Sequence, residues 1–423
     1  MTATARPLSV RQDRRLVRAQ SGSTRHLLLH ITAPTARAGR PRAAVNLAFV
    51  LDRSGSMSGQ KIALAKRALE QALARLHDED RFSVVVYDDQ IDLVVESTRA
   101  SAEAKRNALA RLNDVDARGS TNLADGWLRG CEQVGLHQGT ETIDRCLLLT
   151  DGLANVGITD RRELEGHAAE LRARGVSTTT FGLGADFDDV LLQAMADAGG
   201  GHFYYVETAQ QIPDYLTSEV GETLEVVARD VALAVNAPGV LVEPLTPLPC
   251  HRAGEATLIP LGELLSEQEL DLVLKLKFPY GTIGQEQRVA VRLIDREGVL
   301  GGPTESVTFV YADHRANDAQ SRDRIVDAHV ARLYANKARQ EAVALNRSGA
   351  YDRARNVLSA VADRIREYAA DDPELLAIIG ELERDVPVFA ASMAEPTRKT
   401  MAFQAYSLAH GRDLQGRARK LQG

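Results

Sequence analysis

The stretch Val45-Asn46-Leu47-Ala48-Phe49-Val50-Leu51-Asp52-Arg53-Ser54-Gly55-Ser56 decides the fold at the centre of this chain. Its first seven residues are apolar except for Asn46, which is typical of a parallel strand covered on both faces. The apolar run stops at Asp52, and small or polar residues follow. Apolar residues then recur at helical spacing, at Ile62, Ala65, Leu69, Leu73 and Leu76. This order of strand, polar loop and amphipathic helix indicates an α/β sheet.

The same alternation continues through residues 44–220. Further strand-like runs occupy residues 82–87, 92–98, 146–150, 176–183 and 202–206, and helix-like segments occupy 102–112, 122–134, 161–174, 190–198 and 209–220. The short link Asp88-Asp89-Gln90 joins the first two of these runs, which predicts a hairpin and one antiparallel pair. We therefore predict an α/β fold with an open, doubly wound and mostly parallel sheet, similar to a Rossmann fold.

The period of the pattern changes after residue 224. Short strand-like runs at 231–235, 272–276, 289–293 and 306–310 alternate with Pro and Gly turns, which favours a β-sandwich. Residues 26–33 are a candidate strand of the same sandwich, in which case the α/β domain is inserted into it. From about Ala319 the chain reads as helical, and Ser348-Gly349-Ala350-Tyr351 resembles the turn of a single tetratricopeptide-like helical hairpin.

These patterns divide the chain into four parts. We predict a basic N-terminal arm with the candidate sandwich strand at 1–43, the α/β domain at 44–222, the β-sandwich at 223–312 and a helical region at 313–423. By our count these parts carry charge unevenly: +8 for residues 1–43, −17 for 44–312 and +2 for 313–423. An acidic body argues against nucleic acid as the main partner.

Composition also suggests a compartment. With 44% hydrophobic and 26% charged residues among 423, the chain is typical of a globular protein. Its three cysteines, Cys131, Cys146 and Cys250, are scattered and form no C-x-x-C motif, which favours a reducing environment. No apolar stretch approaches the roughly 18–20 residues of a membrane span, and the N-terminal stretch has no apolar core of a signal peptide. We expect a cytoplasmic protein with no membrane partner.

Three polar loops fall where the carboxyl ends of strands are expected. They are Asp52–Ser56, Gly119–Asn122 and Thr150–Gly152, and open α/β sheets bind their ligands at this edge. Together the loops offer two carboxylates and three hydroxyls, without sulfur or imidazole. Hard cations prefer such oxygen donors, and Mg²⁺ keeps several waters in a near-octahedral shell. Glycines at 55, 119 and 152 let the backbone approach an ion.

On these residues the chain resembles the von Willebrand factor A (vWA) domain family. The family's metal-ion-dependent adhesion site (MIDAS) consists of D-x-S-x-S, a Thr and the Asp of T-D-G. Its matches here are Asp52, Ser54, Ser56, Thr121 and Asp151. The resemblance covers residues 44–220, and Phe181–Gly184 and Ala198–Gly201 look like later segments of the family. More loosely, the order of the flanking elements is similar to that of bacterial intracellular members.

The resemblance implies a function that the residues alone leave open. In that family the serines and the threonine usually touch the metal, the aspartates hold it through water, and a partner's Asp or Glu completes the shell. We therefore expect a protein–protein interaction module, not an enzyme, that uses Mg²⁺ or Mn²⁺, with Ca²⁺ as a further candidate. The alternatives are a metal-dependent phosphoesterase or hydrolase, and a scaffold with a structural metal. The sequence indicates neither the partner's identity nor the oligomeric state.

Other polar groups are expected to be structural. The ten histidines show no metal-ligand spacing, so we interpret them as surface or satisfied core residues. The acidic pairs and triplets Asp88-Asp89 and Asp78-Glu79-Asp80 are expected to solvate turns. Trp127, the only tryptophan, is expected in the core.

Overall fold

The computed structural model describes residues 6–36 and 42–421, and the chain forms two compact units. The first, here called the A unit, consists of Pro41–Glu225 and Glu395–Phe403. The second, here called the sandwich unit, consists of Met1–Arg40, Val226–Ala394 and Gln404–Gly423. The A unit is thus inserted in the sequence between two parts of the sandwich unit.

The A unit is built around one six-stranded sheet with the strand order β6-β5-β4-β7-β8-β9. Its strands are β4 (Ala44–Asp52), β5 (Arg81–Tyr87), β6 (Ile91–Arg99), β7 (Thr142–Thr150), β8 (Val176–Leu183) and β9 (Gly200–Val206). All neighbours are parallel except β5 and β6, so the predicted antiparallel hairpin is confirmed. The predicted fold class, a doubly wound and mostly parallel α/β sheet, is confirmed as well.

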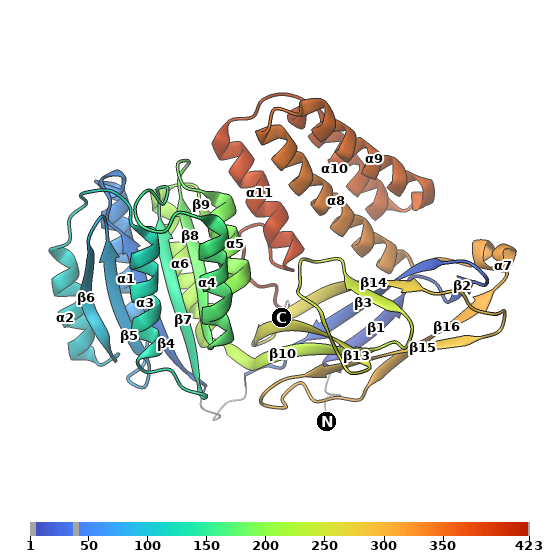
Figure 1. Cartoon of the computed structure of the whole chain (residues 1–423), viewed down its shortest axis with the longest axis horizontal. Coiled ribbons are helices and arrows are strands. Elements are labelled where there is room, and N and C mark those ends of the chain that lie inside the picture. Colours follow the sequence, from blue (N-terminus) through green and yellow to red (C-terminus); the bar gives the residue numbers. More distant parts are fainter. Residues whose placement is uncertain (1–5, 37–41, 422–423) are drawn as a thin grey trace. The chain divides into compact units, whose positions relative to one another are not determined.

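Helices cover both faces of this sheet (Figure 1). They are α1 (Gln60–Arg75), α2 (Ala102–Asn113), α3 (Leu123–Gly135), α4 (Arg161–Ala173), α5 (Asp189–Gly199) and α6 (Ile212–Leu224), with the short 3₁₀ turns η1 (Gly55–Met57) and η2 (Ala209–Gln211). Four of the helices begin at a polar residue whose side chain accepts a hydrogen bond from the helix's free backbone N–H groups. These N-caps are Ser101, Asn122, Asp160 and Asp188. Side-chain capping therefore fixes the residue at which each of these four helices begins.

The strands at the centre of the sheet are apolar because both of their faces are covered. Phe49 of β4 is fully buried, as is Leu148 of β7. Burying a side chain of this size contributes roughly 1.5–3 kcal/mol. Trp127 of α3 is also fully buried, as predicted, and its indole N–H donates to Thr178 Oγ1 at 3.2 Å.

The sandwich unit contains two sheets. One has the order β1-β3-β14-β11, and the other β12-β13-β10-β15-β16-β2. Their bounds are β1 (Leu8–Gln12), β2 (Leu16–Arg18), β3 (Ser23–Thr32), β10 (Val226–Asn236), β11 (Leu241–Pro244), β12 (His251–Ala253), β13 (Ala256–Leu265), β14 (Glu269–Phe278), β15 (Glu286–Ile294) and β16 (Glu305–Ala312). Leu29 and Leu274 from one sheet and Leu233 and Val291 from the other share one hydrophobic core, which defines the sandwich.

Residues 6–36 hold more structure than a basic arm with one strand. Beyond the candidate strand at 26–33, which lies mostly in β3, the chain forms β1 and β2. β1 pairs with β3, and β2 pairs in parallel with β16. The sequence also gave no indication of β11, β12 or β13. Residues 37–41, part of the predicted arm, lie outside the described residues.

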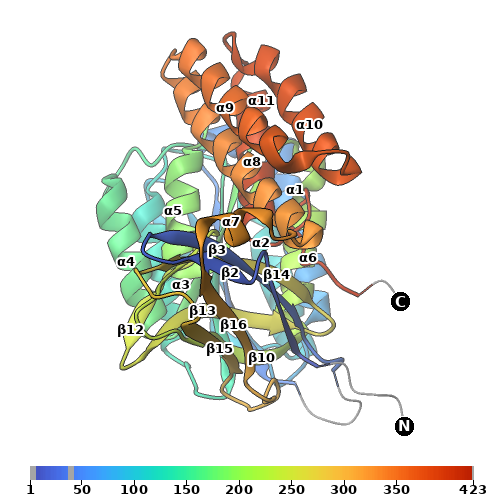
Figure 2. The same ribbon diagram turned by 90° about the vertical axis from the view of Figure 1, so that its right-hand side faces the viewer.

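The C-terminal region is helical. It comprises α7 (His314–Ala319), α8 (Arg324–Arg347), α9 (Tyr351–Ala369), α10 (Pro373–Phe389) and α11 (Glu395–Ala409). Gly349, with φ of +77°, lies in the turn between α8 and α9, the pair predicted as a helical hairpin and visible in Figure 2. Among the described helices, none combines the length and the apolar character that crossing a membrane requires.

The first half of α11 belongs to the A unit and not to the sandwich unit. Lys399 is almost fully buried, and its ammonium donates to the Phe187 carbonyl while lying 3.6 Å from the centre of the Phe187 ring. Phe403 packs edge-on against Phe203. The sequence pattern gave no indication of this packing.

Candidate metal centre

The sheet brings two of the three polar loops to the same edge. β4 and β7 are parallel neighbours in register, with Leu51 opposite Leu149. β4 therefore ends at Asp52 beside Thr150, the last residue of β7, and Asp151 follows directly. Because the carboxyl ends of parallel strands meet at one edge, this edge gathers both predicted carboxylates.

Hydrogen bonds join the Gly119–Asn122 loop to the segments that follow β4 and β7. The Gly55 N–H donates to the Gly119 carbonyl at 3.1 Å, which ties the first loop to the Gly119–Asn122 loop. The Thr121 N–H donates to Asn155 Oδ1 at 3.0 Å, and the Asn155 N–H donates back to the Thr121 carbonyl at 3.2 Å. Thr121 is thus held just before Asn122 caps α3.

The side-chain oxygens of the predicted site form a continuous group. Ser54 Oγ lies 3.0 Å from Ser56 Oγ, and Ser56 Oγ donates to Asp151 Oδ1 at 2.7 Å. A Cβ placed on Gly152 would lie 3.3 Å from Thr121 Oγ1 and 3.9 Å from Ser56 Oγ, so these two hydroxyls flank one point. The structure therefore brings Ser54, Ser56, Thr121 and Asp151 together around the edge of the sheet.

Asp52 lies behind this group, at the base of the site. Its Oδ1 accepts the Ser54 N–H at 2.7 Å and its Oδ2 accepts the Thr150 hydroxyl at 2.7 Å. The carboxylate is fully buried, and this burial raises the pKa of Asp52 to about 6 against the opposing effect of those hydrogen bonds; nearby Asp151 raises it further. Two carboxylates this close and this buried favour a cation between or beside them.

Lys61, which the sequence analysis did not single out, also contacts the site. Lys61 lies in the first turn of α1, and its ammonium donates to Asp151 Oδ2. Its side chain is 33% exposed, whereas that of Asp151 is fully buried. The signal in the sequence was a lysine at the start of a helix directly after the Asp52–Ser56 loop, where the helix dipole disfavours a positive charge.

Of the acidic residues predicted to solvate turns, Asp78, Glu79 and Asp89 are exposed, but Asp88 beside the site and Asp80 at the opposite end of the strands are buried. Asp88 is fully buried and accepts hydrogen bonds from Arg118 Nε at 2.8 Å and from the Gln90 N–H at 2.7 Å, with Arg53 Nε at 3.2 Å. Burial raises the pKa of Asp88, but these hydrogen bonds and the charge of Arg53 outweigh it and lower the pKa. Asp80 is likewise fully buried, against Arg42 at 2.6 Å.

Gly119 shows why this loop needs a glycine. Its φ is +69°, which side-chain-bearing residues rarely adopt, and a Cβ there would lie only 2.1 Å from Asp89 Oδ1. The loop before Thr121 can therefore pass close to Asp88 and Asp89 only with glycine at this position.

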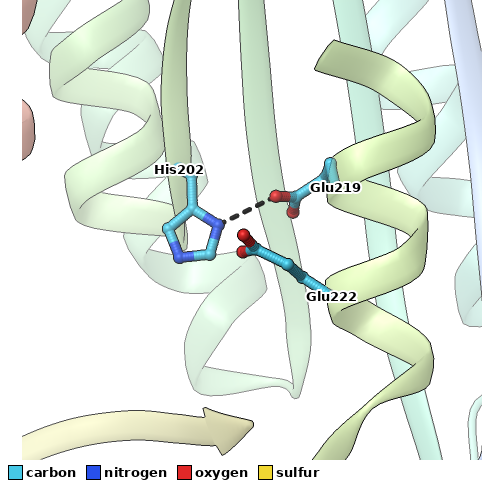
Figure 3. A group of neighbouring side chains, drawn as sticks. All are labelled: His202, Glu219 and Glu222. Atoms are coloured by element: carbon cyan, nitrogen blue, oxygen red, sulfur yellow. Dashed lines mark hydrogen bonds and ion pairs between the residues drawn. The ribbon is translucent and has the colours of Figure 1, made fainter. Parts of the chain in front are cut away.

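A second group of candidate ligands lies elsewhere in the A unit, and sequence reasoning missed it. The ligand atoms of His202, Glu219 and Glu222 all lie within 4.8 Å of one another (Figure 3). The residues come from β9 and from α6, with no spacing that marks a metal motif. His202 Nδ1 lies 3.0 Å from Glu219 Oε2.

The contacts of Glu219 indicate a structural role for this second group. Its fully buried carboxylate already takes four partners. Oε1 accepts from Arg145 at 2.6 Å and from Thr179 at 2.9 Å, while Oε2 accepts from Tyr204 at 2.7 Å and faces His202. A metal would have to displace some of these partners, and separating Arg145 from Glu219 would leave a buried charge without its counterion.

Comparison with known proteins agrees with the geometry of the A unit. Residues 46–218 match the family model of the von Willebrand factor type A domain, a family that often mediates protein–protein interaction through metal-dependent sites. The chain superimposes over 99% of its length on a von Willebrand factor type A protein from Catenulispora acidiphila, covering 98% of that chain, with a TM-score of 0.71 and 18% identity. An ArnB paralog, VWA2, from Sulfolobus acidocaldarius gives a TM-score of 0.56 at 16% identity, over 91% of this chain and 99% of that one. The A unit therefore has the vWA fold.

Similar sequences align with about two fifths to just over half of this chain. An uncharacterised Escherichia coli protein, YfbK, is 33% identical over 197 residues, which cover 46% of this chain and 34% of the relative. An uncharacterised Synechocystis protein, sll0103, is 30% identical over 56% of this chain and 57% of its own length. Human inter-alpha-trypsin inhibitor heavy chain H4 is 30% identical over 41% of this chain and 19% of its length. The chain thus spans from about a fifth to just over half of these curated relatives.

Proposed function

We propose that this protein is a metal-dependent interaction module that binds an acidic side chain of a protein partner. The metal is Mg²⁺, or Mn²⁺, with Ca²⁺ as a further candidate, held by Asp52, Ser54, Ser56, Thr121 and Asp151. The observation that carries the proposal is the convergence of these oxygens. Two buried carboxylates and three hydroxyls from three separate loops meet at one edge of the sheet.

The donor set suits a hard cation and leaves it with waters that a ligand from outside can replace. Oxygen-only ligands match Mg²⁺ and Mn²⁺, and Mg²⁺ keeps part of its water shell when it binds protein. A carboxylate from another protein can replace one of those waters, with an attraction that low local dielectric strengthens. We propose a cytoplasmic location and no direct role for nucleic acid or a membrane. The identity of the partner depends on loops that the chemistry of the ion does not specify.

Binding rather than catalysis is also part of the proposal. Catalysis by a bound metal would gain from a positioned base or a cationic clamp free to reach the substrate. Arg53, the basic residue within the first loop, is instead engaged by Asp88 at 3.2 Å and by Asp92 at 2.5 Å. Phosphoester hydrolysis remains the alternative, and turnover that disappears in an Asp151→Ala variant would favour it.

Calorimetry with Mg²⁺ tests the metal site directly. We expect binding by the full chain, loss of binding in Asp151→Ala, and unchanged binding in Asp78→Ala. Asp78 is an exposed carboxylate just before β5, at the other end of the strands, so it controls for a general change in charge. Equal heats for the wild-type chain and Asp151→Ala would refute the site.

Water relaxation with Mn²⁺ tests the coordination position for a partner. Bound Mn²⁺ relaxes the protons of its exchanging waters, so a carboxylate that replaces one water lowers the enhancement. We expect a Glu-containing peptide to lower it at millimolar concentration and the same peptide with Gln to leave it unchanged. An enhancement that neither peptide changes would favour a scaffold with a structural metal.

A further inference from the structure

Lys61 is placed against the anionic centre of the site in a way that its local structure does not favour. It lies in the first turn of α1, which contains no acidic residue. The amino end of a helix carries partial positive charge, so a lysine there needs an anion to offset the repulsion. That anion is Asp151, whose Oδ2 accepts from the Lys61 ammonium while Oδ1 accepts from Ser56.

The two ends of this contact differ in exposure. The Asp151 carboxylate is fully buried, whereas a third of the Lys61 side chain is exposed. A buried carboxylate needs a counterion at all times, because leaving one unpaired is strongly destabilising. A lysine on a flexible stem at the rim can supply that charge and also withdraw into solvent without a large cost.

We propose that Lys61 is an internal cation that competes with the divalent metal for Asp151. This inference rests on the proposed function. When a divalent ion binds, its two positive charges repel the nearby ammonium and take over the neutralisation of Asp151. Lys61 then moves toward solvent. The lysine thereby keeps the site stable at low metal concentration and weakens the affinity of the site for metal.

The test compares Lys61→Met and Lys61→Arg with the wild-type full chain. Lys66→Gln is the matched control, because Lys66 lies on the same helix and donates to the Asn113 carbonyl at 3.0 Å. Unfolding of the A unit is followed through Trp127, the single tryptophan, which is fully buried in this unit. Each variant is measured in EDTA and in saturating Mg²⁺, and the dissociation constant for Mg²⁺ is measured by calorimetry.

Competition predicts a specific combination of results. In EDTA the Lys61→Met variant unfolds at a lower temperature than the wild type, and saturating Mg²⁺ removes most of that difference. Its affinity for Mg²⁺ is higher than that of the wild type, by about tenfold or more, since the ion no longer has to displace the Lys61 ammonium from Asp151. Lys61→Arg and Lys66→Gln behave like the wild type in both measurements.

Other outcomes would overturn the proposal. If Lys61→Met bound Mg²⁺ more weakly, or if its loss of stability were equal with and without Mg²⁺, Lys61 would be a positioning residue that works together with the metal. The proposed function fails separately. Binding of Mg²⁺ by Lys61→Met but not by the wild type would support competition and refute metal use by the natural chain, and no binding by either protein would refute both.

Discussion

Two buried carboxylates of the A unit, Glu219 and Asp52, have their charge balanced in two different ways. Glu219, on α6, takes an Arg145 ion pair and hydrogen bonds from Thr179 and Tyr204, with His202 beside it. Asp52, at the carboxyl edge, takes neutral donors: the N–H and the side chain of Ser54 and the Thr150 hydroxyl. Both carboxylates are fully buried.

The difference separates a structural carboxylate, Glu219, from Asp52, which we propose as a metal ligand. Glu219 has its counterion built in, and its four contacts fix α6 against β7, β8 and β9. The negative charge of the Asp52 carboxylate is only weakly offset, in agreement with its raised pKa. Its neighbours are hydroxyls that can turn toward an ion. A buried group held in its charged form against its environment is a common mark of a functional site.

Removing the counterion of Glu219 should have the largest effect on stability. Arg145→Met leaves the buried Glu219 carboxylate without its ion pair, which typically costs about 3–5 kcal/mol. Denaturant unfolding followed by Trp127 measures the change in free energy, and Mg²⁺ should not restore it. The control is Arg129→Met, an exposed partner of Glu132, where the change should stay below about 1 kcal/mol. A small effect of Arg145→Met would mean that Glu219 is not the structural carboxylate of the pair.

Removing a neutral donor from Asp52 should affect both stability and metal binding. Thr150→Val leaves Asp52 Oδ2 without its hydrogen bond, at a cost of roughly 1–3 kcal/mol. We also expect a loss of Mg²⁺ affinity of about 10–100-fold, because groups that orient a metal's ligands have effects of that size.

Thr180→Val provides a matched control for that variant. Thr180 is equally buried on the neighbouring strand β8, but its hydroxyl donates to the Leu192 carbonyl at 2.8 Å and not to the site. It should lose comparable stability and keep its Mg²⁺ affinity. Equal metal affinities in the two variants would show that Asp52 does not depend on Thr150 for its orientation.

The sequence sufficed to predict the sheet of the A unit and the edge of that sheet at which the candidate ligands gather, because both follow from local patterns. An apolar run followed by a polar loop marks the carboxyl end of a parallel strand, and topology then brings such ends together. The strand that ends at Asp52 and the strand that ends at Thr150 can each be predicted from their own residues alone. The strands of the sandwich are harder to predict from the sequence. For example, β13 pairs with β10 through register shifts, and its residues alternate only weakly between the two faces of the sheet.

What sequence reasoning missed depends on pairs that are distant in the chain. Asp88 meets Arg118 at a separation of 30 residues, and Asp80 meets Arg42 at 38. From sequence alone, an acidic pair in a turn is predicted to be exposed to solvent, because the distant arginine that pairs with it is known only from the fold. Glu219 and Arg145 are 74 residues apart, and Lys61 looks like any lysine on the surface of a helix. Charge pairing is a tertiary property that no local period reveals.

A third carboxylate, Asp271 of the sandwich unit, is paired with histidines, whose charge changes with pH. Asp271 lies 2.8 Å from His30 Nδ1 and 3.4 Å from His329 Nε2. Burial would raise the pKa of Asp271, but hydrogen bonds from His329 and His30 outweigh it and lower the pKa to about 2. In return, the hydrogen bond to Asp271 raises the pKa of His329.

The sign of the resulting pH dependence follows from these directions. The raised pKa of His329 stabilises the fold below the ordinary value of 6.5, and this contribution is lost as the pH rises through the raised pKa. The lowered pKa of Asp271 stabilises the fold above the ordinary value of 3.8, and this is lost as the pH falls toward 2. The interaction is therefore strongest between about pH 4 and 6.5.

Histidine NMR titration measures this directly. Asp271→Asn should lower the pKa of His329 toward its ordinary value, because the hydrogen bond to Asp271 is the main cause that raises it. Glu374→Gln should lower it less, because Glu374 acts on His329 only as a more weakly contributing charge. An unchanged pKa in Asp271→Asn would mean that the histidine does not serve as the counterion.

The smallest expected effect concerns space at the metal site rather than charge. Gly152→Ala adds a Cβ at 3.3 Å from Thr121 Oγ1, which is tight enough to push that hydroxyl by a few tenths of an ångström. Stability should change by no more than about 0.5 kcal/mol, while Mg²⁺ affinity should fall a few-fold because Thr121 is displaced from the ion. Gly166→Ala, on the exposed face of α4 with open space around it, should instead stabilise the chain by roughly 0.5–1 kcal/mol and leave metal binding unchanged. If both alanine variants bound Mg²⁺ like the wild type, Thr121 would not be a ligand, and Ser54 and Ser56 would be the remaining hydroxyl ligands proposed for the metal.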